Sequence, residues 1–308
     1  MASQNLSSDQ QSLLWGDESL FRSNFDQAPF YLQHSLVGHP LFEKSRLIQL
    51  ANLLKRDPGN ISFDSGDIHV EDGWNKRPPK QYTLDEVMER IECTGAWVIL
   101  KRTEIDPPYR ALMNEIMSDI ERLSGRNIRK ETKNLEAHIL LTSPGRITPF
   151  HMDNECNLLF QVQGEKDIFV FDQTDREILT EVELESFWLG NWSAAKYKAR
   201  YQERAKSFRL VPGKAIHVPV NAPHWVKNDD NVSVSLSINF EWKDESLYNV
   251  YRANCFLRKM GIKPQPPGRS HFTDSIKNTA IAAGFLPAKN MARSAITFLR
   301  RFKKKQSH

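Results

Sequence analysis

The stretch that decides the fold is Thr148-Pro-Phe-His151-Met-Asp153-Asn-Glu-Cys-Asn157-Leu-Leu-Phe-Gln-Val-Gln-Gly164-Glu-Lys166. Its alternation of apolar and polar residues predicts a strand, a Gly-Glu turn and a second strand that opens with Lys166. Side chains at i and i+2 of a strand point to the same side, so His151 and Asp153 can face one ion while Met152 faces away. His224 follows His151 by 73 residues, after Pro219-Val-Asn-Ala-Pro. The pattern predicts that a distant strand brings a third polar side chain alongside.

Two imidazoles and one carboxylate on one face of a metal leave the opposite positions free for a co-substrate and dioxygen, which is the ligand set of non-haem Fe(II) oxygenases. The bare pattern is not specific, because His-x-Asp with a later His arises by chance among 9 His and 38 acidic residues. The alternative interpretation is a surface His and an Asp beside a turn. Lys166, at the start of an inward-facing strand, is well placed to pair with a carboxylate beside the metal.

The surrounding residues resemble the JmjC and cupin-like family of 2-oxoglutarate-dependent oxygenases, in particular its branch with the asparaginyl hydroxylase that acts on hypoxia-inducible factor. The resemblance implies that His151, Asp153 and His224 bind Fe(II). It favours His224 over His217 as the distal ligand, since the interval after the proline fits the family. The likeness covers about residues 140–242, is looser before them and is absent after about residue 260.

The same resemblance implies a site for the co-substrate 2-oxoglutarate. Thr148, three residues before His151, and Lys166, fifteen after it, match the residues that bind its distal carboxylate in the family. Asn157 and Asn239 match two residues that line the co-substrate pocket there. Among the remaining histidines, His138 is expected to pack in the first barrel strand. The others are interpreted as ordinary surface or core residues without ligand spacing: His34, His39, His69, His271 and His308.

The expected activity is therefore that of a non-haem Fe(II)- and 2-oxoglutarate-dependent dioxygenase, which releases succinate and CO2. Retention of Asp153 favours a hydroxylase, or a demethylase that acts through hydroxylation, because related halogenases have lost this carboxylate. The substrate is a protein side chain, a small metabolite or a lipid head group. The alternative function is a non-catalytic cupin-like binding or regulatory module that uses the cavity as a sensor.

Composition agrees with an enzyme of the cytoplasm. The chain has 308 residues, 40% of them hydrophobic, enough for one large core with or without a small accessory domain. Its three cysteines form no C-x-x-C pair, which favours a reducing compartment. No signal peptide pattern opens the chain, and no apolar run is long enough to span a membrane.

The fold class predicted is α+β, with a double-stranded β-helix, or jelly roll, flanked by helices. Short strands with turn signals indicate this core. The expected organisation is a polar, disordered or loosely attached lead (1–30), an α/β region packing on the barrel (31–135), the jelly-roll core (136–243) with an insertion (172–207), and a C-terminal helical region (244–308).

The insertion 172–207 is a candidate substrate-facing lid, because long loops within compact folds are often functional. Its aromatic and basic residues could recognise an acidic or planar partner, or they could cap the outer face of the barrel: Trp188, Trp192, Tyr197, Tyr201, Lys196, Lys198, Arg200 and Arg204. Trp225, beside His224, is a candidate for either the pocket wall or the core.

Two further contacts are expected from the C-terminal region. A helix from Ser246 to Met260 either closes the barrel or, as the family resemblance implies, forms a homodimer through Leu247, Val250, Tyr251 and Phe256. Residues 288–305 have the apolar and basic spacing of an amphipathic helix, suited to an anionic membrane surface, to an acidic partner or to packing on the body. Nucleic acid is not an expected partner, because no nucleic-acid-binding motif is present.

Overall fold

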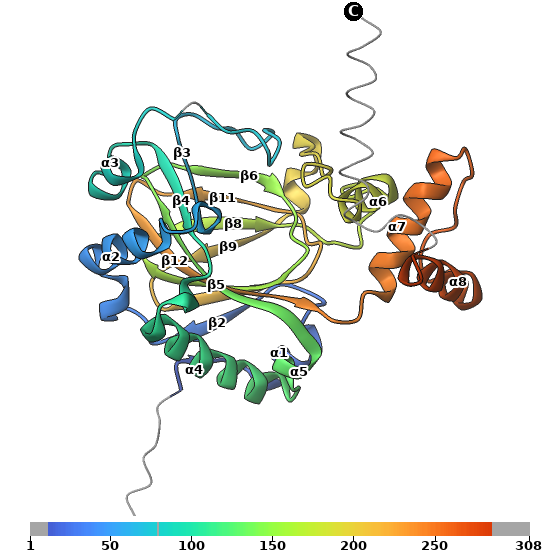
Figure 1. The fold of residues 1–308 in the computed structure, drawn as a ribbon, viewed down its shortest axis with the longest axis horizontal. Coiled ribbons are helices and arrows are strands. Elements are labelled where there is room, and N and C mark those ends of the chain that lie inside the picture. Colours follow the sequence, from blue (N-terminus) through green and yellow to red (C-terminus); the bar gives the residue numbers. More distant parts are fainter. Residues whose placement is uncertain (1–11, 79, 285–308) are drawn as a thin grey trace, which may run out of the picture.

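The computed structural model describes residues 12–78 and 80–284, and it contains two antiparallel sheets (Figure 1). The larger sheet has eight strands in the order β1-β2-β10-β7-β12-β5-β4-β3. Their bounds are β1 Leu14–Trp15, β2 Phe30–His34, β10 Lys214–Val218, β7 Cys156–Gln163, β12 Ser233–Trp242, β5 Thr132–Thr142, β4 Ala96–Leu100 and β3 Ile61–Ser65. The smaller sheet has the order β6-β11-β8-β9, with bounds Ile147–His151, His224–Asn228, Lys166–Val170 and Lys206–Leu210.

The two sheets pack face to face. One buried apolar cluster joins Leu159 and Ile216 of the larger sheet to Ile168, Leu210 and Val226 of the smaller one. Strands that alternate inward and outward side chains across two facing sheets make a sandwich with an open end. The architecture is the jelly roll that the sequence predicts.

Helices cover the outer face of the larger sheet, and for that reason its central strands are buried on both sides. The described helices are α1 Glu18–Asn24, α2 Lys44–Leu54, α3 Leu84–Glu89, α4 Pro107–Ser124, α5 Ile128–Glu131, α6 Glu181–Trp188, α7 Ser246–Lys259 and α8 His271–Ala282. The longest, α4, starts at a proline and is followed by Gly125, whose φ of 68° is the left-handed conformation that glycine adopts freely after a helix end. Its apolar stripe belongs to the main core.

Residues 12–30 correct the prediction of a loosely attached lead. They form β1 and α1, and Leu14 and Phe21 are fully buried. The backbone N–H groups of Leu13 and Leu14 donate to one carboxylate oxygen of Asp119 on α4, at 2.8 and 3.0 Å. A few buried side chains and the Asp119 carboxylate hold this segment against the core, which its polar composition did not predict. Residues 1–11 lie outside the described part of the chain.

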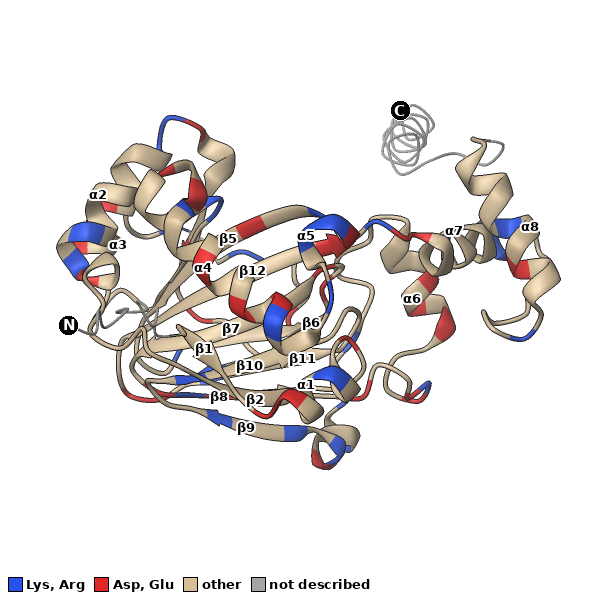
Figure 2. Cartoon of the chain, turned by 90° about the horizontal axis from the view of Figure 1, so that it is seen from below, with Lys and Arg blue, Asp and Glu red and all other residues tan. Residues whose placement is uncertain are grey.

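The region expected to pack on the barrel extends the larger sheet instead. β2 pairs with β10, and β4 pairs with β5, so strands from residues 31–135 lie on both sides of the core strands. At the other end of the chain, α6, α7 and α8 lie together beside the sandwich in both views (Figures 1 and 2). No described helix has the length and hydropathy needed to cross a membrane. The predicted amphipathic segment 288–305 lies outside the described residues.

Candidate metal centre and co-substrate pocket

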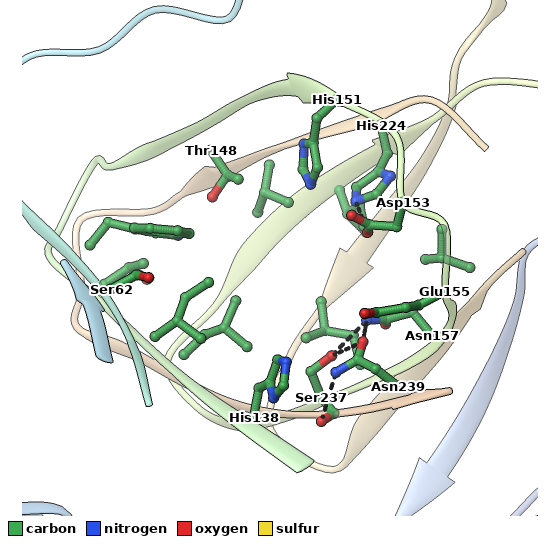
Figure 3. A pocket seen from close by; sticks show the side chains of 18 of the residues that line it. Ser62, His138, Thr148, His151, Asp153, Glu155, Asn157, His224, Ser237 and Asn239 are labelled. Atoms are coloured by element: carbon green, nitrogen blue, oxygen red, sulfur yellow. Dashed lines mark hydrogen bonds and ion pairs between the residues drawn. The ribbon is translucent and has the colours of Figure 1, made fainter. Parts of the chain in front are cut away.

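The paired strands β6 and β11 bring the predicted ligands together. His151 ends β6 and lies opposite His224, the first residue of β11. Asp153 follows β6 by two residues, and one ligand atom from each of the three side chains lies within 4.8 Å of the others. Figure 3 shows the three side chains converging at one end of a cavity. The structure thus confirms the convergence that the spacing predicts.

Both imidazoles are held in one orientation by backbone carbonyls. His151 Nδ1 lies 2.7 Å from the Pro149 oxygen, and His224 Nδ1 lies 3.0 Å from the Ala222 oxygen. A proton on each Nδ1 satisfies these contacts and leaves Nε2 free to bind a metal. His224 Nε2 lies 3.7 Å from Asp153 Oδ2. Burial, reinforced by His224, lowers the pKa of His151 to about 4, so this ring stays neutral and able to act as a ligand near pH 7.

Lys166 projects into the same cavity and has no acidic partner among the described residues. Its side chain is buried, with only 3% of the residue exposed, and Nζ donates to Ser235 Oγ at 2.6 Å. Burial lowers the pKa of Lys166 to about 7. Buried ammonium groups are otherwise paired, because desolvation of an isolated charge is costly. Thr148, also predicted, lines this cavity of about 330 Å³ with Lys166.

The two predicted asparagines face each other across paired strands. Asn157 of β7 is the register partner of Asn239 of β12. Asn157 Nδ2 donates to Asn239 Oδ1 and to Ser237 Oγ, both at 2.6 Å. Both asparagines line the cavity, and Figure 3 shows this cluster beside His138, at the end away from His151 and His224. All seven predicted site residues therefore border one cavity.

A family model described as "Cupin-like domain" matches residues 70–246, more than half of the chain. The chain belongs to this cupin-like family. The matched region contains β6 and β11, the paired strands that carry the two histidines of the metal centre. The family resemblance stated from the sequence is confirmed at this level.

Curated relatives match part of this cupin-like chain. HSPB1-associated protein 1 of Rattus norvegicus is 28% identical over 151 residues, which are 46% of this chain and 30% of the relative. Its Homo sapiens counterpart is 30% identical over 127 residues, which are 38% of this chain and 26% of the relative. The matched region thus spans less than a third of the length of these relatives.

Solved structures with a similar fold include the Escherichia coli ribosomal oxygenase YcfD. One YcfD structure is 13% identical, covers 89% of this chain and 67% of its own, and has a TM-score of 0.49. Another, in complex with cobalt and 2-oxoglutarate, is 14% identical, covers 87% and 66%, and also has a TM-score of 0.49.

His217, the other candidate for the distal ligand, lies outside the metal centre. It is fully buried, accepts a hydrogen bond from the Asp26 N–H at 2.9 Å, and packs between the rings of Phe25 and Phe30. Burial lowers its pKa to about 3. It is a neutral core histidine that fastens the α1 segment to β10.

Sequence reasoning missed several residues of the cavity. Trp74 and Trp97 form part of its wall, and the ring of Trp74 stacks on that of His151. His138, expected to pack in its strand, lines the cavity instead, beside Glu136 at 3.6 Å. Glu155 also lines it, and burial raises the pKa of Glu155 to about 8. Glu155 and His138 had a local signal, since they lie at i+2 from Asp153 and from Glu136.

The insertion between β8 and β9 does not border the cavity, although it was a candidate lid. Two of its basic side chains pair within the insertion, Lys198 with Glu183 and Arg204 with Asp175 and Glu177. Trp188 is buried and stacks on Tyr248 of α7 at 3.7 Å. The cap interpretation therefore describes these residues better. Trp225, the other ambiguous residue, stacks on Phe169 and is not part of the cavity wall.

The insertion is linked to the metal centre through hydrogen bonds that reach the backbone of Asp153. Trp188 Nε1 donates to Asn221 Oδ1 at 3.1 Å, and the Asn221 N–H donates to the Asp153 carbonyl at 3.0 Å. Asn221 adopts a positive φ of 64°, which asparagine tolerates better than most residues. This chain of contacts links α6 to Asp153 and to the turn that leads into His224.

Proposed function

We propose that this protein is a non-haem Fe(II)- and 2-oxoglutarate-dependent dioxygenase that acts as a hydroxylase. One observation carries the proposal: a His-Asp-His cluster and a buried lysine without a carboxylate partner border the same cavity. The cluster accounts for a metal, and the lysine accounts for an anionic co-substrate. A structural role for either alone would not require the other.

The donor set fits Fe(II). Two neutral imidazoles and one carboxylate, all from one side, are the donors that such iron sites use while leaving positions open. His151 and His224 would bind through Nε2, and Asp153 through a carboxylate oxygen. When bound, the iron supplies the activation of dioxygen that couples decarboxylation of 2-oxoglutarate to succinate and CO2 with oxidation of a C–H bond.

The chain's own residues bind and orient the co-substrate. Lys166, in its charged form, would pair with the distal carboxylate of 2-oxoglutarate, and the Thr148 hydroxyl would donate to the same group. The Asn157–Asn239 pair is fixed by its hydrogen bonds and presents amide groups to the cavity. Burial of Lys166 keeps water from competing for its ammonium group, which strengthens selection for a dicarboxylate.

The volume of the cavity bears on the size of the substrate. About 330 Å³ is near the lower limit for ligand pockets. That space suits 2-oxoglutarate together with one group the size of an amino-acid side chain. We therefore favour a protein side chain or a small molecule as the substrate. Retention of Asp153 favours hydroxylation, or demethylation through hydroxylation, over halogenation.

The test is turnover of 2-oxoglutarate. Purified protein with Fe(II), ascorbate and 2-oxoglutarate should release succinate slowly even without a substrate, and Asp153→Ala should lower that rate by at least about 100-fold. Asp230→Ala, which removes an exposed carboxylate, is the matched control and should keep the rate. Equal rates for the wild type and Asp153→Ala would refute the metal site. Binding of metal and 2-oxoglutarate without succinate would favour the non-catalytic module.

A further inference from the structure

Trp74, which lies between β3 and α3, packs against a predicted metal ligand. The rings of Trp74 and His151 are nearly parallel, with centroids 4.0 Å apart and an interplanar angle of 10°. Trp74 is only partly buried and also forms part of the cavity wall. Trp74 is therefore not simply a core residue, because it is partly exposed and stacks on a predicted metal ligand.

Neighbouring side chains hold the indole in place. Trp97 of β4 meets Trp74 edge to face, at 5.8 Å and 88°. The Arg77 guanidinium carbon lies 5.5 Å from the Trp74 ring centroid and 5.4 Å from that of Trp97. Arg77 Nη1 also donates to the Trp74 carbonyl at 2.6 Å. The orientation of Trp74 is therefore fixed from two sides before any metal arrives.

The loop itself is fastened at both ends of this region. The Phe150 N–H, next to His151, donates to the Val70 carbonyl at 3.0 Å. The Asn75 N–H, next to Trp74, donates to Ser193 Oγ of the insertion at 3.0 Å. Within the loop, Asp72 accepts from the His69 N–H at 2.8 Å and from Lys76 Nζ at 2.7 Å. The strand that carries His151 and the insertion thus share one support.

We propose that Trp74 is a positioning residue for His151, an inference that rests on the proposed function because it presumes that His151 binds a metal. The Pro149 carbonyl fixes one ring nitrogen, yet a single hydrogen bond still allows the imidazole to tilt. The flat contact with Trp74 restricts that tilt and aims Nε2 at the other ligands. The face of an indole also attracts positive charge, so it favours the electron-poor imidazole of the metal-bound state.

Metal binding can be measured without catalysis by titrating the metal-free protein with Co(II) and recording its visible spectrum. Trp74→Leu keeps an apolar side chain but removes the aromatic face, and it should raise the Kd for Co(II) by about 10-fold and shift the visible bands. Trp74→Phe should restore a Kd close to that of the wild type. Trp15→Ala, which removes an exposed tryptophan from β1, should change neither the Kd nor the spectrum.

The outcomes separate this inference from the proposed function. If the wild type takes up no Co(II), the metal site and the role of Trp74 both fail. If the wild type binds, His151→Ala does not, and Trp74→Leu matches the wild type in Kd and spectrum, the role of Trp74 alone is refuted. Should Trp74→Leu not fold, Ser193→Ala releases the loop while keeping Trp74. It must then weaken Co(II) binding by a smaller factor, and an unchanged Kd would refute the inference.

Discussion

Lys166 is a residue at which stability and the proposed function oppose each other. Its ammonium group is buried with one hydroxyl partner, Ser235, and with no carboxylate among the described residues. Ser235 also donates to Gln161 Oε1 at 2.8 Å, so it keeps a partner if the lysine is replaced. Removing the charge should therefore relieve a desolvation cost without leaving a new unsatisfied group.

We predict that Lys166→Met raises the free energy of unfolding by about 2–4 kcal/mol at pH 6 and abolishes 2-oxoglutarate binding. Burial lowers the pKa of Lys166 from 10.5 to about 7. Between these values the unfolded chain holds more protons, so wild-type stability should rise with pH and the gap to the mutant should narrow. Urea denaturation at pH 6 and pH 9 measures both effects. A mutant less stable than the wild type at pH 6 would contradict the prediction.

Site residues could be predicted where the residues that act together lie close in sequence. His151 and Asp153 share a strand face, and Lys166 follows the next turn, so alternation alone aligned them. His224 needed the family resemblance to be preferred over His217, because both precede or follow a proline in similar surroundings. Trp74 could not be predicted, since it reaches His151 from a loop 77 residues earlier and nothing near it in sequence indicates that contact.

The insertion has the aromatic and basic composition that predicts a lid, but its contacts are those of a packed structural element. Its aromatic residues join the main core or pack against it, and α6 packs on α7. The sequence predicts an insertion over residues 172–207, and the observed connection between β8 and β9 is 171–205, but the sequence pattern does not indicate which face of the sandwich it covers. That choice depends on partners such as Tyr248, which lies in a helix beyond the barrel.

We predict that Trp188→Ala lowers the free energy of unfolding by about 3–5 kcal/mol, because it leaves a large cavity in the core. It should also weaken Co(II) binding, since the hydrogen bond to Asn221 that supports Asp153 is lost. Urea denaturation and Co(II) titration measure the two effects. Val182→Ala, on the exposed side of the same helix, should change neither by more than about 0.5 kcal/mol. An unchanged stability in Trp188→Ala would show that α6 is not part of the core.

At the scale of the whole molecule, the jelly roll followed from the strand pattern, whereas the edges of the larger sheet did not. β4 has the apolar run of a buried strand, but β1, β2 and β3 come from residues without a clear strand pattern, and long-range pairing places all four in the larger sheet. The predicted helix Ser246–Met260 corresponds to α7, Ser246–Lys259. Its expected interface changes, because Val250 and Tyr251 are buried inside the chain and cannot meet a second copy.

A homodimer through the C-terminal helices remains a prediction, now with other residues. α7 and α8 stand beside the sandwich, and they expose Leu247 (48%), Phe272 (75%) and Ile276 (54%). Phe272 and Ile276 are four residues apart and so share one face of α8. Light scattering after size exclusion should give a dimer for the wild type and a monomer for Phe272→Asp with Ile276→Asp. Val37→Asp, an equally drastic change at an exposed site elsewhere, should leave the dimer intact. Exposed apolar side chains that gather on one helix face often mark a protein–protein interface. A wild type that stays monomeric across micromolar concentrations would rule out this interface.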